Sequence, residues 1–349
     1  MNSFWSEARF VAAAAVLVAG LVGTPIGAAA GEVTVIKMAT LAPEGSAWYK
    51  LLERMGEDWR QASGGAVTLR IYPGGVVGDE AAMIRKMRVG QLQAAAVTGL
   101  GLAALEKSFY ALLVPMMYAD DGELDHVRER LAPLLERQLE QKGFVVLAWG
   151  DAGWVSFFTK TPVTRPAETM ATKLFVGTDD STVVQLYTET GFNPVQLSSM
   201  DILPGLQTGL INAFAATPLA ALAFQWFALA PNMTDLRFSP LTGATIIDKR
   251  AWEKIPEGLR PRILAASRAS EALVRGEIRR LNTEAVGAMT KNGLKIAHVS
   301  PEVQAEWVKI IEGLYPRLRG PIIPEAAFDA ALSARDEYRA AKAKGPVAR

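Results

Sequence analysis

The segment best suited to chemistry is Gly99-Leu-Gly-Leu-Ala-Ala104, which imitates the glycine-rich turn that binds dinucleotide phosphates. Asp120 and Asp121 follow about 20 residues later, where such sites carry an acidic residue for the ribose. However, the segment follows the third expected strand of its region instead of the first, and the two aspartates lie in a turn beyond Pro115. We therefore expect no nucleotide cofactor.

The other candidates for catalysis are two histidines and several acidic residues. His126 and His298 lack the spacing of a metal-binding pair or of a serine triad, and the chain contains no cysteine. Asp120-Asp121 and Asp179-Asp180 have the positions of turn and helix-start residues, and the charged segment from Arg128 to Arg137 is interpreted as a solvent-exposed helix face. The sequence predicts no catalytic residue, no metal site and no cofactor, and it favours binding without turnover.

The balance of charges argues against a polyanionic partner. The chain has 37 Lys and Arg residues against 36 Asp and Glu residues, and its net charge is +1. Binding to nucleic acid typically needs a clustered excess of basic side chains. We therefore expect no nucleic-acid partner.

Residues 1–30 are expected to form a cleaved secretory signal peptide. Arg9 precedes an uncharged apolar run from Phe10 to Val22, and Ala28-Ala-Ala30 offers small residues at a cleavage site. This run has 13 residues, whereas a membrane-spanning helix needs roughly 20. With no cysteine to carry a lipid, the sequence predicts an unanchored periplasmic protein.

A repeated segment indicates how the rest of the chain is built. Arg88-Val-Gly-Gln-Leu-Gln-Ala-Ala-Ala96 returns about 120 residues later as Gln207-Thr-Gly-Leu-Ile-Asn-Ala-Phe-Ala215. In each copy a helical pattern stops at a glycine, Gly90 or Gly209, which adopts the left-handed conformation without a steric penalty. A strand, a helix, a strand and a helix are expected before each copy, and an apolar strand after its glycine. The order β-α-β-α-β occurs twice, which predicts two α/β lobes with mainly parallel sheets and a cleft for a small ligand.

The expected lobes and connections divide the chain as follows. Lobe I covers residues 31–150 with a return segment near 242–275, and lobe II covers residues 151–241. Two strands, Lys142 to Trp149 and Trp154 to Thr159, are interpreted as a pair that crosses between the lobes. A long helix over residues 261–292 is expected to brace both lobes, and helices over residues 300–344 are expected to close the chain.

The sequence resembles the extracytoplasmic solute receptors of TRAP transporters over about residues 34 to 295. The resemblance lies in an ordered series of motifs: Ile36-Lys-Met-Ala-Thr-Leu-Ala-Pro43, Tyr72-Pro-Gly-Gly-Val-Val-Gly-Asp79, Lys173-Leu-Phe-Val176, Gly191-Phe-Asn-Pro-Val195, Leu206-Gln-Thr-Gly209 and Ala251-Trp252. It implies a two-lobe periplasmic binding protein fold that closes on a ligand. It also implies delivery of the ligand to the small and large membrane subunits of a TRAP permease.

Three departures from the family pattern coincide at the implied ligand site. Phe175 stands where the usual receptor has an arginine that holds a carboxylate, and Val155 stands where a second arginine is usual. Phe214-Ala-Ala216 replaces a run that is normally polar. Phenylalanine cannot form the bidentate salt bridge of a guanidinium, and a buried carboxylate without a cation is unfavourable by several kcal/mol. We therefore predict a lipid-like ligand that is apolar or amphipathic.

The predicted site residues fall into two groups. Aromatic side chains are expected to form a pocket poor in water: Phe175, Phe214, Trp154 and Trp149. Polar side chains are expected to orient a hydroxyl or amide head group: Thr40, Thr98, Asp151, Thr217 and Gln225. Each has a plain alternative, because aromatic residues in parallel strands are usually core and the polar residues also suit turns and helix caps.

Two other functions remain open at the sequence level. The receptor could bind a small organic monocarboxylate through another cation, for which Lys37, Lys160 and Lys173 are the candidates. Alternatively, the chain could be a periplasmic lipid carrier or interaction protein that works without a TRAP permease. Genes for a small and a large membrane subunit beside this one would favour a receptor.

Overall fold

The computed structural model describes residues 33–177, 180–269 and 271–344, which belong to one compact unit. The expected signal peptide lies outside the described residues. Within them, no helix has the length and apolar character that crossing a membrane requires.

The first copy of the repeat has the expected order of elements. Ser46 caps the first helix by accepting the N–H of Tyr49, and Asp79 caps the second by accepting the N–H of Ala82. Gly90 follows with φ +77°, in the left-handed region. The elements are β1 (Thr34–Thr40), α1 (Ala47–Ala62), β2 (Val67–Tyr72), α2 (Glu80–Arg88) and β3 (Ala94–Thr98).

The second copy repeats this order. Its last helix, preceded by a short 3-10 turn η2 (Ser199–Asp201), ends at Gly209 with φ +74°. The left-handed glycine expected at the end of each copy is therefore present. The elements are β5 (Lys173–Val176), α6 (Ser181–Glu189), β6 (Asn193–Gln196), α7 (Ile202–Thr208) and β7 (Ala213–Ala216).

The sheet order repeats as well. The described strands form the path β2-β1-β3-β9-β4-β7-β5-β6, where β4 is Phe144–Thr159 and β9 is Ser239–Asp248. Within each copy the strands pair in parallel, and the third strand then pairs antiparallel with a long strand. We call β2-β1-β3-β9 the first half-sheet and β4-β7-β5-β6 the second. The expected α/β fold with mainly parallel repeats is confirmed, whereas the exact lobe boundaries stay an interpretation.

The connection between the half-sheets differs from the expected strand pair. Residues 144–159 form the single strand β4, with irregular register between Val146 and Ala148 and between Asp151 and Gly153. Gly153 has φ +114°, so one residue absorbs the bend that was expected to separate two strands. Strand β9 returns beside β3, as expected for the segment that leads back to the first half-sheet.

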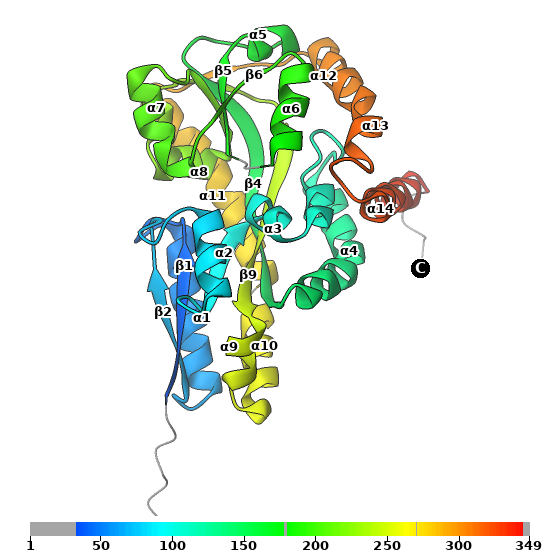
Figure 1. Ribbon diagram of the computed structural model, residues 1–349. Coiled ribbons are helices and arrows are strands. Elements are labelled where there is room, and N and C mark those ends of the chain that lie inside the picture. The colour runs from blue at the N-terminus through cyan, green and yellow to red at the C-terminus, as the bar shows by residue number, and fades with distance from the viewer. Residues whose placement is uncertain (1–32, 178–179, 270, 345–349) are drawn as a thin grey trace, which may run out of the picture. The chain divides into compact units, whose positions relative to one another are not determined.

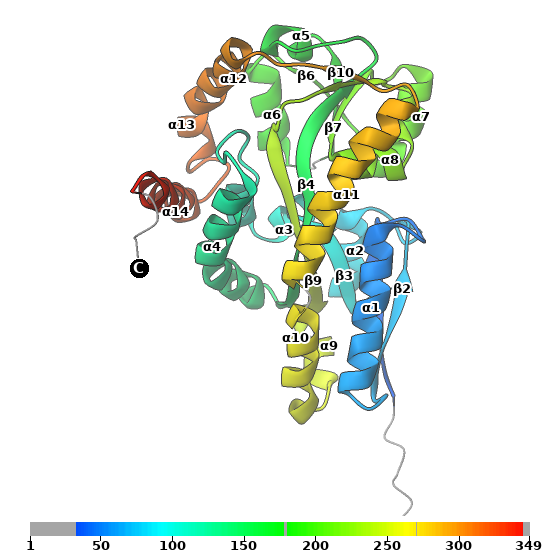
Figure 2. The ribbon, with the colours of Figure 1, turned by 180° about the vertical axis from the view of Figure 1, so that it is seen from behind.

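The expected brace over residues 261–292 corresponds to two helices, α10 (Arg260–Ala269) and α11 (Glu271–Lys291), on either side of residue 270, which is not described. Figures 1 and 2 show α11 crossing β4 on the face opposite α3 (Gly99–Leu105), with α4 (Asp121–Gln141) at the side of β4. Helix α1 lies beside α10. The brace thus contacts β4, which belongs to the second half-sheet, and α1, which covers the first.

The remaining elements complete the two half-sheets and the C-terminus. The expected final helices are present as α12, α13 and α14, and Figure 1 shows α14 beside α4. These elements are η1 (Lys107–Leu112), α5 (Pro166–Met170), α8 (Pro218–Ala223), η3 (Trp226–Ala228), β8 (Asn232–Thr234), α9 (Lys249–Lys254), η4 (Glu257–Leu259), β10 (Lys295–Ala297), α12 (Pro301–Gly313), α13 (Tyr315–Leu318) and α14 (Glu325–Ala343).

Candidate ligand-binding site

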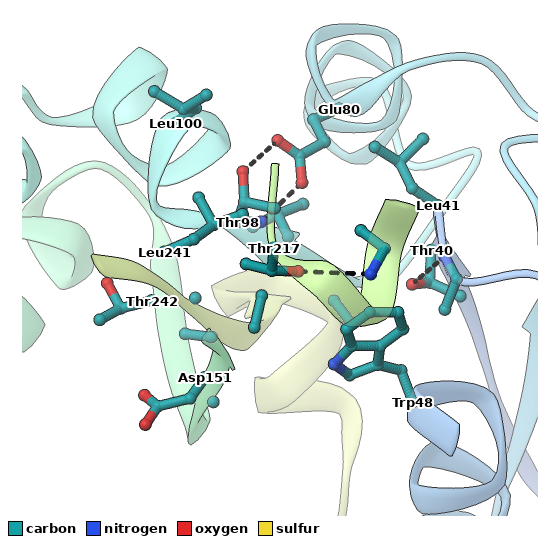
Figure 3. A pocket seen from close by; sticks show the side chains of 18 of the residues that line it. Thr40, Leu41, Trp48, Glu80, Thr98, Leu100, Asp151, Thr217, Leu241 and Thr242 are labelled. Atoms are coloured by element: carbon teal, nitrogen blue, oxygen red, sulfur yellow. Dashed lines mark hydrogen bonds between the residues drawn. The ribbon is translucent and has the colours of Figure 1, made fainter. Parts of the chain in front are cut away.

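A cavity of about 310 Å³ lies where the parallel strands of both half-sheets end. Thr40 ends β1 and Thr98 ends β3, while Gly177 follows β5 and Thr217 follows β7. Figure 3 shows Thr40, Thr98 and Thr217 around this space. Ligand pockets typically measure roughly 300 to 1,000 Å³ and favour the carboxyl ends of parallel strands. The cleft expected from the repeat is therefore present as a cavity of suitable size.

The lining of the cavity is mainly apolar. Phe175 and the stacked pair Phe224 and Trp226, whose ring centroids are 4.6 Å apart, contribute aromatic surface from the second half-sheet. Small residues of β3, β4, β7 and β9 leave the space open: Ala96, Ala148, Gly150, Ala152, Ala215, Ala216, Gly243 and Ala244.

The charged groups at the cavity are all acidic. Among the described lining residues these are Glu80, Asp151 and Glu271, and no Lys, Arg or His is present. The three lysines that the sequence offered as alternative anchors, Lys37, Lys160 and Lys173, lie outside the lining. The described part of the lining therefore presents no cation to a carboxylate.

Glu80 is half-buried at the strand ends, with no Lys, Arg or His among the described lining residues around it. Its carboxylate accepts the backbone N–H of Thr98 at 2.5 Å and the Thr98 hydroxyl at 2.8 Å, as Figure 3 shows. Burial raises the pKa of Glu80, and the hydrogen bonds from Thr98 oppose this rise. Glu80 thus orders the end of β3.

Asp151 belongs to a buried ionic cluster. Its carboxylate pairs with Arg128 of α4 at 2.7 Å and with Arg279 of α11 at 3.0 Å. Burial raises the pKa of Asp151, and the two guanidinium groups oppose this rise. The expectation that Arg128 lies on a solvent-exposed face is wrong, because its side chain is only 3% exposed in this pair. The two arginines neutralise Asp151 from outside the cavity lining.

Glu271 lies at the first turn of α11. One carboxylate oxygen accepts the backbone N–H of Trp149 at 2.9 Å, beside the irregular register of β4. Burial raises the pKa of Glu271, which the hydrogen bond from Trp149 opposes. The Glu271 side chain therefore holds β4 in place and also lines the cavity.

The predicted threonines line the cavity and also stabilise local turns. The Thr40 hydroxyl accepts the N–H of Ala42 at 3.1 Å, and the Thr217 hydroxyl caps α8 by accepting the N–H of Ala220 at 3.4 Å. Thr98 instead donates to Glu80. Thr40 therefore stabilises a turn and Thr217 caps a helix. Contact of the three threonines with a ligand stays a prediction.

The predicted aromatic residues are divided between the cavity and the core. Phe175 lines the cavity. Trp149 also lines it, but the Trp149 ring stacks on Phe109 and its Nε1 donates to Glu136. The backbone N–H of Trp149 is thus held by Glu271 at the cavity, while its indole contacts Phe109 and Glu136.

Three predicted site residues lie outside the lining. Phe214 is fully buried and stacks on Phe158 with ring centroids 5.0 Å apart. Trp154 donates from Nε1 to Asp121, and Gln225 takes a left-handed turn with φ 57° before η3. Side chains alternate across a strand, so Phe214 packs into the core while Ala215 lines the cavity. Core packing, the plain alternative for the aromatic residues, fits Phe214 and Trp154. A turn, the plain alternative for the polar residues, fits the exposed Gln225.

The sequence reasoning missed a wall made by α1. Trp48, Leu51, Leu52 and Met55 all line the cavity. Their spacing at i, i+3, i+4 and i+7 marks one apolar helix face, which was visible in the sequence. Such a face normally packs against a core, so the pattern alone did not distinguish a binding wall from a buried interface.

Comparison with known proteins places the chain in a family. Residues 38–319 match the family described as bacterial extracellular solute-binding protein, family 7. The chain belongs to this family. It is 22% identical over 293 residues to the C4-dicarboxylate-binding periplasmic protein DctP of Rhodobacter capsulatus, covering 83% of this chain and 88% of that relative. Family 7 proteins are solute receptors and not enzymes, as the absence of a catalytic motif predicted.

Solved structures of TRAP periplasmic solute-binding proteins share the fold. The sugar acid binding protein DctPAm of Advenella mimigardefordensis, in complex with galactonate, has a TM-score of 0.82 at 16% identity and covers 88% of this chain and 99% of its own. A TRAP periplasmic solute-binding protein of Sulfurospirillum deleyianum, with bound succinate, has a TM-score of 0.77 at 18% identity and covers 86% and 98%. The predicted two-lobe receptor fold is thus confirmed.

Proposed function

We propose that this family 7 protein is a periplasmic receptor for a neutral, apolar or amphipathic small molecule, which it delivers to the small and large membrane subunits of a TRAP permease. The observation that carries the choice of ligand is the described lining of the cavity, which is mainly apolar and contains no Lys, Arg or His. The wall of Phe175, Phe224 and Trp226 supports an apolar contact surface.

The energetic argument rests on desolvation. Moving a carboxylate from water into an apolar cavity costs several kcal/mol unless a cation or several donors compensate. The described lining has no guanidinium or ammonium group to compensate a carboxylate, and Phe175 offers no donor. A neutral head group escapes this penalty and can donate to Glu80 or to the threonine hydroxyls at the strand ends.

A small organic carboxylate is the second candidate, supported by the relatives. The R. capsulatus relative is a C4-dicarboxylate-binding protein, and the compared structures hold galactonate and succinate. At 16% to 22% identity such a ligand does not transfer by similarity alone. The absence of Lys, Arg and His from the described lining weighs against a carboxylate.

Native mass spectrometry of protein purified without refolding tests the proposal. A co-purified neutral lipid-like molecule is the expected result, and a co-purified small organic acid would overturn it. Titration calorimetry with 1-decanol and decanoate, which share a tail and differ in the head group, provides the matched comparison. The alcohol should bind at least about tenfold more tightly, since a difference of about 1.4 kcal/mol corresponds to tenfold. Tighter binding of decanoate or succinate would favour the second candidate.

A further inference from the structure

The cavity extends beyond the strand ends into a space between helices. On one side lie Trp48, Leu51, Leu52 and Met55 of α1, and on the other lie Ser267 of α10 with Glu271 and Val274 of α11. The α1 residues have helical spacing and form one face of that helix, while α10 and α11 together provide the opposite wall. We call this space the α1–α11 arm.

The core holds the walls of the arm in place. Trp48, Leu51 and Val274 pack around buried Leu219 and Ile278. Leu52 and Met55 pack in a second cluster with Trp59 and Ile263. Because both walls are fixed by core packing, the arm is formed before any ligand arrives, and a ligand need not reorganise α1 to enter it.

The polar groups of the arm are already hydrogen-bonded. The buried Ser267 hydroxyl accepts Nε1–H of Trp59 at 2.8 Å and donates to the carbonyl of Ile263 at 2.8 Å. Glu271 accepts the N–H of Trp149. The arm therefore offers aliphatic and indole surface to a ligand, whereas Thr40, Thr98 and Glu80 contribute polar groups to the same cavity.

We infer that the α1–α11 arm receives the hydrocarbon tail of the ligand, with a neutral head group held at the strand ends. This inference rests on the proposed function and narrows it to one class, neutral molecules with a single extended tail. An apolar space left empty is unfavourable, because its walls lose contacts that a tail would restore. The length of the arm then sets an upper limit on the length of the tail.

Titration calorimetry with 1-alkanols from hexanol to tetradecanol measures this limit. Each added methylene should tighten binding about fourfold, the fold-change that follows from burial of one CH₂ group, until the arm is full. Beyond that length the gain should stop or reverse. Leu51→Trp fills the arm and should move the limit to shorter alkanols, with at least a tenfold loss for the optimal wild-type ligand.

Leu222→Trp is the matched control. Leu222 packs against the same hydrophobic cluster as Leu51 but does not line the cavity. The affinity of Leu222→Trp should therefore depend on alkanol length as it does in the wild type. Thermal melting of all three proteins verifies that they fold. If Leu51→Trp folds and keeps the wild-type profile, the arm does not hold the tail, although the proposed function stands. If the wild type binds no alkanol and binds succinate instead, the proposed function fails.

Photolabelling of the unmodified protein gives an answer that does not depend on any variant. The probe is 1-decanol with a diazirine at the far end of its tail, and the labelled peptides are identified by mass spectrometry. Labels within α1 or the first turns of α11 are the expected result. Labels confined to Phe175–Gly177 and to residues 217–226 would overturn the inference, because the tail would then lie against the second half-sheet.

Discussion

Phe175 and Glu80 show how two side chains set the chemistry of the cavity. Phe175 occupies the position at which the family resemblance implies a carboxylate-binding arginine, and the structure places it in the cavity lining. Glu80 was not identified from the sequence, because Asp79-Glu80 has the composition of an ordinary helix start. Its burial and its bonds to Thr98 emerged only when α2 was placed against the end of β3.

Replacement of Phe175 by arginine tests whether the ligand lies against this side chain. Phe175→Arg should weaken 1-decanol binding by about 2 to 4 kcal/mol, because it buries a charge without a partner on the ligand. Phe175→Leu is the control and should lose only about 1 kcal/mol, since it keeps an apolar surface. Titration calorimetry measures both. Unchanged affinity of Phe175→Arg would place the ligand away from β5.

At the scale of elements, Arg128 joins three segments that are distant in sequence. It lies in α4, pairs with Asp151 in β4 and with Asp125, and Asp125 in turn pairs with Arg279 of α11. Such a cluster fixes the irregular part of β4 between two helices. Because its charges are buried, loss of one partner leaves another charge uncompensated.

Arg128→Ala should therefore lower the free energy of unfolding by about 3 to 5 kcal/mol, as measured by urea denaturation. Arg130→Ala, in the same helix, is the control. Arg130 pairs with Glu337, but both side chains are about half exposed, so its loss should cost about 0 to 1 kcal/mol. Equal effects of the two substitutions would show that the cluster contributes no more than a surface pair.

The left-handed glycines at the ends of α2 and α7 allow a second test of the elements. A Cβ at Gly90 or Gly209 would meet no atom within 4 Å, so alanine brings only the backbone cost of positive φ. Each substitution to alanine should lower the free energy of unfolding by about 1 to 2 kcal/mol. Gly287→Ala, in the interior of α11 with equally open space, should instead be neutral or raise it by up to about 1 kcal/mol. Denaturation with urea again gives the comparison.

At the scale of the whole molecule, two contacts join the half-sheets around the cavity. Lys107 of η1 pairs with Asp180, the N-cap of α6, at 2.8 Å. Met200 of η2 approaches Gly75 so closely that a Cβ at Gly75 would lie 2.7 Å from the Met200 sulfur. We interpret these contacts as features of a closed receptor, in which ligand and interlobe contacts stabilise the same state.

Lys107→Met should weaken 1-decanol binding by up to about fivefold, the scale of a partly exposed ion pair. Burial raises the pKa of Asp180, but the hydrogen bond and charge of Lys107 together with the hydrogen bonds from Thr182 outweigh this effect, and the net result is a lowered pKa. The ion pair therefore contributes its full stabilisation at pH values above the ordinary carboxyl pKa of 3.8. This stabilisation is lost as the pH falls through the lowered pKa and Asp180 becomes protonated. The difference between Lys107→Met and wild type should therefore be constant from pH 5 to 8, as measured by calorimetry. A difference that vanishes within this range would exclude Asp180 as the relevant partner.

The sequence by itself determined the repeated α/β plan, the two left-handed glycines and the receptor family. These features depend on local rules, because periodicity and glycine stereochemistry act within a few residues. The family resemblance singled out Phe175, and the positions of Thr40 and Thr98 at strand ends singled out these threonines, since parallel strands end at one edge of a sheet. All three line the cavity, and their contact with a ligand stays a prediction.

Only the tertiary structure decided which apolar residues face the cavity and which pack the core. Phe214 and Phe175 have the same character in the sequence, yet Phe214 stacks on Phe158 while Phe175 lines the cavity. The apolar face of α1 and the buried pair of Arg128 with Asp151 were likewise settled by which helix packs beside which strand. Hydrophobic burial is not directional, so a sequence reveals that a side chain avoids water but not which partner or ligand it meets.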